Sequence, residues 1–141
     1  TVGWSFADSD ASGTLSDGDE FTPAVSSAVD IITFKDGDIL DLTAFNLGSP
    51  LGAEQLYVGD SASIGNGNFA FVQGVYDGTT GKFEYYDDTD TGGADKTATD
   101  LLVTFDSDTT GSFTQSGVVL QGVTDLDFAT EILTASDSSL I

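Results

Sequence analysis

Short β-prone runs, broken every few residues by Gly, Asp, Asn or Ser, constrain the fold of this chain more than any other feature. Helical periodicity is almost absent, whereas alternation such as that of Leu101, Val103 and Phe105 places apolar side chains on one face of an extended strand. The runs expected to form strands are residues 2–7, 29–34, 38–43, 54–58, 68–73, 82–86, 101–105, 118–121 and 126–128. This spacing predicts an all-β fold, either an antiparallel β-sandwich or a β-roll-like domain.

Two pairs of aromatic residues give a further expectation about the faces of these strands. Phe69 and Phe71 should share one face, and Phe83 and Tyr85 should share another. A single helical turn is expected over residues 43–47. The most loop-like stretch covers residues 89–99.

The length of 141 residues suits one domain with a real core and is too short for two ordinary ones. We therefore expect a single β-domain over residues 1–141. Hydrophobic residues make up 39% of the chain and include ten Phe, so the domain should fold despite its charge. Because the sequence begins at Thr1 and not at Met, we expect it to be an excerpt of a larger secreted protein.

The formal net charge of −21 comes from 24 acidic residues against three lysines. Such a field repels nucleic acid and anionic lipid, so cations are the expected partners. Of the acids, 20 are Asp and 4 are Glu, which fits turns and oxygen-ligand metal loops better than a merely solvated surface. Adaptation to saline surroundings is the alternative explanation. No apolar run approaches the roughly 18 residues of a membrane span, so no membrane insertion is expected.

The stretch from Asp8 to Glu20 matches the twelve-position pattern of an EF-hand calcium loop. Gly13 takes the position of the sharp turn, and Leu15 supplies the apolar anchor that follows it. The last ligand is open, because Asp19 is one methylene shorter than the usual Glu and Glu20 comes one residue late. The oxygen-bearing residues at the ligand positions are Asp8, Asp10, Ser12, Thr14 through its carbonyl, Ser16 and Asp19 or Glu20. No helical pattern flanks the loop, and the alternative is a turn with no metal.

Two later segments repeat parts of this pattern. The spacing of Asp8, Asp10 and Ser12 before Gly13 recurs before Gly111, where the corresponding residues are Asp106, Asp108 and Thr110. This second loop lacks an acid at its last position, for which Asp100 is a candidate. A denser acidic segment holds Asp87, Asp88, Asp90 and Asp95; it is either a calcium site or a solvated loop. Asp36 and Asp38 flank a glycine, where a plain turn is the favoured interpretation.

Residues 29–45, with the sequence VDIITFKDGDILDLTAF, resemble a segment of RTX proteins, the calcium-binding substrates of type I secretion. The similar segment leads out of the β-roll in serralysin-type metalloproteases, and later strands of this chain, up to residue 128, resemble that C-terminal domain as well. The matching positions are Asp30, Ile32, Phe34, Gly37, Asp38, Ile39, Asp41 and Leu42. The chain departs from the family because it lacks the nonapeptide repeat array, and without histidine it lacks the protease zinc motif. The resemblance implies a secreted, calcium-associated β-domain near the C-terminus of a larger protein.

No enzymatic activity is expected, since a chain without His or Cys offers neither a Ser-His nor a Cys-His dyad. The expected function is that of a calcium-binding extracellular β-domain, with Ca2+ as cofactor, that folds after export. One alternative is a structural subunit of a surface layer, adhesin or extracellular fibre, whose partners are copies of itself or other surface proteins. Another is a carbohydrate-binding module that uses Trp4 and exposed tyrosines to stack on sugar rings.

Overall fold

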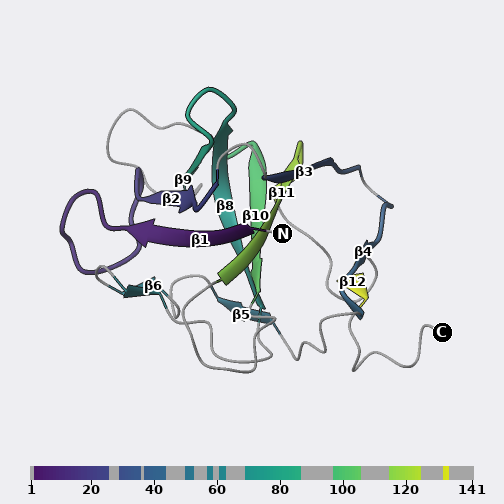
Figure 1. The fold of residues 1–141 in the computed structure, drawn as a ribbon, viewed down its shortest axis with the longest axis horizontal. Coiled ribbons are helices and arrows are strands. Elements are labelled where there is room, and N and C mark those ends of the chain that lie inside the picture. The colour runs from purple at the N-terminus through teal and green to yellow at the C-terminus, as the bar shows by residue number, and fades with distance from the viewer. Residues whose placement is uncertain are drawn as a thin grey trace.

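The computed structural model describes residues 2–25, 29–35, 37–43, 50–52, 57–58, 61–62, 69–86, 97–105, 115–124 and 132–133 (Figure 1). These residues contain no α-helix, and the prediction of an all-β fold is confirmed. None of them forms a helix of the length and hydropathy needed to cross a bilayer. The strands are β1 Val2–Ala7, β2 Glu20–Pro23, β3 Asp30–Thr33, β4 Leu40–Asp41, β5 Pro50–Gly52, β6 Tyr57–Val58, β7 Ser61–Ala62, β8 Phe69–Asp77, β9 Lys82–Tyr85, β10 Asp100–Phe105, β11 Gln115–Gln121 and β12 Ile132–Leu133.

Most of these strands belong to an 8-stranded sheet in the order β1-β2-β9-β8-β10-β11-β3, with β5 added beside β8. Strand β1 also pairs with β11, so the antiparallel strands from β1 round to β11 form a closed ring. In Figure 1, β1 crosses the direction of β8, β10 and β11. Strands β3 and β5 pair in parallel with β11 and β8, which makes the sheet mixed and not wholly antiparallel.

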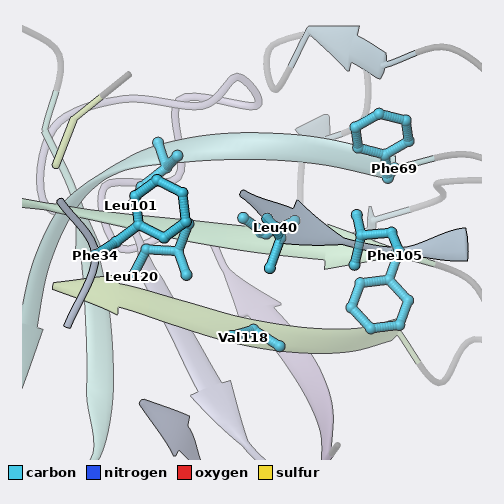
Figure 2. Packing of buried hydrophobic residues seen from close by; sticks show 9 residues of the cluster. Phe34, Leu40, Phe69, Leu101, Phe105, Val118 and Leu120 are labelled. Carbon is cyan, nitrogen blue, oxygen red and sulfur yellow. The ribbon is translucent and has the colours of Figure 1, made fainter. Parts of the chain in front are cut away.

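Strand β10 lies at the centre of the sheet and is buried along its whole length. Its odd-numbered residues Leu101, Val103 and Phe105 belong to a first hydrophobic cluster, shown in Figure 2. This cluster also contains Phe34, Leu40, Leu42, Phe69, Val118 and Leu120. Each such large side chain contributes about 1.5–3 kcal/mol when fully buried.

The opposite face of β10 forms a second hydrophobic cluster, in which Leu102 meets the strands that close the ring. The other members of this cluster are Trp4, Phe21, Ala70, Val72, Phe83, Tyr85 and Val119. The expected faces are therefore confirmed: Phe69 and Phe71 pack on the first cluster, and Phe83 and Tyr85 belong to the second. Strands β8, β10 and β11 therefore carry buried side chains on both faces of the sheet.

Several predicted strands appear with shifted bounds, and the prediction omitted β2, β5, β7 and β12. Strand β8 continues past the expected end at residue 73 to Asp77. Strand β2 pairs with β9 only at Glu20 and Phe21. Pro23, the last residue of β2, lies beyond this pairing, so its missing N–H removes no hydrogen bond to β9. The expected strand at 126–128, and the expected helical turn beyond Thr43, lie outside the described residues.

Candidate metal centre between strands β1 and β2

The loop formed by residues 8–19 connects two strands that pair directly at its base. Ala7 lies opposite Glu20 in the antiparallel register of β1 and β2, so the two ends of the loop are held together. Leu15 is partly buried and packs against the second hydrophobic cluster, as expected of the apolar anchor. Gly13 and Gly18 have φ angles of 80° and 89°, a conformation that glycine adopts without steric cost. The loop is thus anchored at both ends and in its middle.

Three carboxylates converge inside this loop. One oxygen each from Asp8, Asp10 and Asp19 lies within 4.8 Å of the others. The Asp19 residue is 0% exposed, whereas Asp8 is half-buried and Asp10 is exposed. The centre therefore combines one buried carboxylate with one half-buried and one exposed carboxylate.

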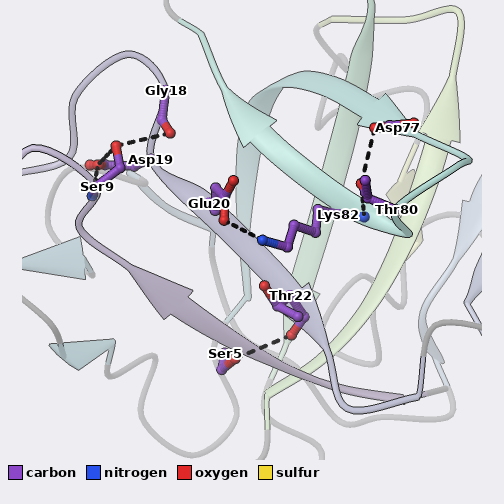
Figure 3. A network of polar contacts seen from close by, with 9 residues as sticks. All are labelled: Ser5, Ser9, Gly18, Asp19, Glu20, Thr22, Asp77, Thr80 and Lys82. Carbon is purple, nitrogen blue, oxygen red and sulfur yellow. Dashed lines mark hydrogen bonds and ion pairs between the residues drawn. The ribbon is translucent and has the colours of Figure 1, made fainter.

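The buried carboxylate of Asp19 accepts hydrogen bonds from Ser9, drawn in Figure 3, and from Ser16 near the other end of the loop. Its Oδ1 accepts the Ser9 amide at 2.8 Å and the Ser9 hydroxyl at 3.1 Å. Its Oδ2 accepts the Ser16 amide at 2.8 Å, and the Ser16 hydroxyl oxygen lies 3.4 Å away. Asp19 therefore ties the beginning of the loop to its end.

The two outer carboxylates organise the middle of the loop. Asp8 Oδ2 accepts the Gly13 amide at 2.8 Å, and Asp10 Oδ1 accepts the Ser12 amide at 3.0 Å. Ser12 Oγ donates to the Thr14 carbonyl at 2.9 Å, and Ser16 Oγ donates to Asp10 Oδ2 at 3.1 Å. The expected ligand positions thus form one connected network of oxygen atoms.

This donor set contains only carboxylate, hydroxyl and carbonyl oxygens, which are the ligands of a hard cation such as Ca2+. It includes no nitrogen or sulfur donor of the kind that zinc or copper prefers. Three carboxylates so close together repel one another at neutral pH, and a divalent cation relieves that repulsion. The residues present therefore fit calcium.

Glu20, the alternative last ligand, does not join the three carboxylates. Its Oε2 lies 2.7 Å from Lys82 Nζ of strand β9 (Figure 3). Successive side chains of extended backbone point in opposite directions, so Asp19 and Glu20 cannot both face the loop. Asp19 lies beside Asp8 and Asp10, and Glu20, the first residue of β2, lies on the other side. The structure therefore places Asp19 at the last position of the loop.

The other predicted metal ligands are separated from this centre or lie outside the described residues. The latter group comprises Asp87, Asp88, Asp90, Asp106, Asp108 and Thr110, together with Asp36 and Asp95. Asp38 Oδ2 accepts the Lys35 amide at 2.9 Å, and the Asp38 amide donates to the Lys35 carbonyl at 2.9 Å. These bonds are those of a tight turn, as expected for that segment.

Hydrogen bonds from Ser12, first from its hydroxyl and then from its amide, lower the pKa of Asp10 to about 2 from its ordinary 3.8. A lowered pKa in the folded state adds stability above the unfolded value, and this stability is lost as the pH falls through the folded value. In chelator, we expect the free energy of unfolding to decrease between pH 3.8 and about 2. Urea unfolding over this range should show a shallower decrease for Asp10→Asn. Equal slopes in the two proteins, or a carboxyl pKa near 3.8 for Asp10 by NMR, would contradict this assignment.

Strand β9 contacts the loop through its backbone, a feature that the sequence did not predict. The Gly18 amide donates to the Tyr85 carbonyl at 2.9 Å, and the Tyr85 amide donates to the Asp19 carbonyl at 2.9 Å. These bonds continue the pairing of β2 with β9 into the loop. The buried end of the centre is therefore built onto the closed ring of strands.

Asp100, considered as a distant ligand for the later loop, forms a buried clamp of hydrogen bonds between strands. It is 7% exposed, and its Oδ2 accepts the Tyr76 amide of β8 at 3.0 Å and the Thr99 hydroxyl at 3.1 Å. Its Oδ1 accepts the Gly122 amide, just after β11, at 3.2 Å. The carboxylate thereby joins the ends of the strands on both sides of β10.

Removal of this clamp should destabilise the protein without affecting the metal centre. Asp100→Ala leaves the Tyr76 and Gly122 amides without their acceptor. Tyr76 is half-buried, whereas Gly122 is exposed and water can replace its bond, so we expect a loss of about 1–3 kcal/mol in urea unfolding. The matched control is Asp77→Ala, in an exposed turn, with an expected change below about 1 kcal/mol. Equal losses in the two variants would argue against the clamp.

Together, the fold and the loop define an all-β domain with a candidate oxygen-ligand cation centre. Comparisons with protein-family models, with curated proteins and with solved structures found no match. The resemblance to RTX proteins therefore stays a prediction.

Proposed function

We propose that this chain is a non-enzymatic, calcium-binding extracellular β-domain of an RTX-like type I secreted protein. The observation that carries the proposal is the convergence of Asp8, Asp10 and Asp19 oxygens within 4.8 Å, in the loop whose spacing resembles a calcium loop. The charge of −21 supports it, because cations are the natural counterparts of such a surface.

In this proposal, calcium acts as a folding ligand. Extracellular calcium modules bind with Kd values of about 10⁻⁴–10⁻³ M, so the site fills only where calcium reaches millimolar levels. Where calcium is scarce, repulsion among the three carboxylates opposes closure of the loop. Binding adds its free energy to that of folding, so the domain becomes stable after export.

The test is thermal unfolding in chelator, in calcium chloride and in sodium chloride of matched ionic strength. Calcium at about a hundred times its Kd adds about 2.7 kcal/mol of stability. For a chain of this size, that free energy raises Tm by roughly 8 °C. Sodium should have a much smaller effect, and isothermal titration calorimetry should show at least the one site formed by Asp8, Asp10 and Asp19.

Asp8→Ala separates this centre from calcium binding elsewhere in the chain. The variant removes one of the three converging carboxylates, so the part of the Tm rise that belongs to this loop should disappear. The matched control is Asp30→Ala, an exposed acid on strand β3, which should keep the full rise. Equal stabilisation by sodium and calcium would overturn the proposal and favour saline adaptation. An unchanged rise of Tm with calcium in Asp8→Ala would show that this loop is not the calcium site.

The carbohydrate-binding alternative loses Trp4, one of the aromatic residues on which it rested. The Trp4 side chain is 4% exposed and belongs to the second hydrophobic cluster, where it lies over Gly117. A side chain buried in this way cannot offer its face to a sugar ring. Trp4 is a core residue.

A further inference from the structure

We draw no further inference here: the strongest candidate, the outer edge of strand β3 with its exposed Ile31 and Ile32 side chains, carries none because nothing in the described part of the chain shows what covers it.

Discussion

Asp19→Ala is expected to abolish calcium binding at the loop and to lower the free energy of unfolding in chelator by about 3–5 kcal/mol. The loss in chelator follows from the hydrogen bonds of the buried carboxylate, which accepts the amides of Ser9 and Ser16 at 2.8 Å each. The two serine hydroxyls keep other acceptors, the Gly18 carbonyl and the Asp10 carboxylate. Each buried donor left without its partner costs about 1–3 kcal/mol. Urea unfolding in chelator measures this loss, and calorimetric titration with calcium measures the loss of binding.

Two further variants separate charge from structure at this position. Asp19→Asn keeps the shape of the side chain and one acceptor oxygen, so it should lose less stability than alanine while still weakening calcium binding, because the negative charge is gone. Glu20→Gln removes the neighbouring charge, which is paired with Lys82 at the surface, and should change stability by less than about 1 kcal/mol. If Glu20→Gln weakened calcium binding as strongly as Asp19→Asn, the assignment of Asp19 as the last ligand would be wrong.

Gly74→Ala is expected to prevent folding at ordinary temperatures. A Cβ at this position would lie 1.9 Å from the Glu84 carbonyl oxygen and 2.6 Å from Phe83 Cε1. The first of these atoms is backbone within the β8 and β9 pairing, so it cannot move aside without breaking the ladder. Overpacking in a core costs about 1–3 kcal/mol when side chains can yield, and a backbone clash costs more. Circular dichroism and the dispersion of NMR amide signals would show the loss.

The matched control is Gly78→Ala, in the turn that follows strand β8. A Cβ there has no atom within 4 Å, and its φ lies outside the left-handed region. This substitution should be neutral or should stabilise by about 0.4–1 kcal/mol, because it restricts the unfolded chain. A folded and stable Gly74→Ala protein would show that β8 and β9 do not approach as closely as the structure has them.

Patterns within short stretches of sequence predicted individual strands and the calcium-like loop. The alternation of Leu101, Val103 and Phe105 gave the central strand and its face, and the spacing around Gly13 brought the loop oxygens together, because those residues are neighbours in the chain. The pairing of β1 with β11 and the parallel addition of β3 were not predictable in this way. They depend on contacts between distant segments, which no short sequence window contains.

The same reasoning explains what was missed at the site. The choice between Asp19 and Glu20 depended on where β2 begins, and that strand was not predicted. Its four residues, Glu20–Pro23, are too short a run to show a clear alternation of apolar and polar side chains. The contact of Tyr85 with the loop depends on the pairing of β2 with β9, which joins segments about sixty residues apart. The high β-propensity of residues 82–86 indicated a strand there, but it did not indicate that this strand pairs with β2.

The closed ring of strands also bears on the order in which the chain can fold. Val2 lies opposite Gly117, so β1 gains its second neighbour only after the chain has been made as far as β11. Contacts this distant close slowly, because the entropy of the intervening loop is lost before the pairing stabilises it. A nascent or truncated chain that ends before β11 would leave β1 and β10 with unpaired edges, which are templates for pairing with other chains. Strand β11 thus covers one edge each of β1 and β10, and we expect vulnerability to aggregation to be concentrated in the interval before β11 is made.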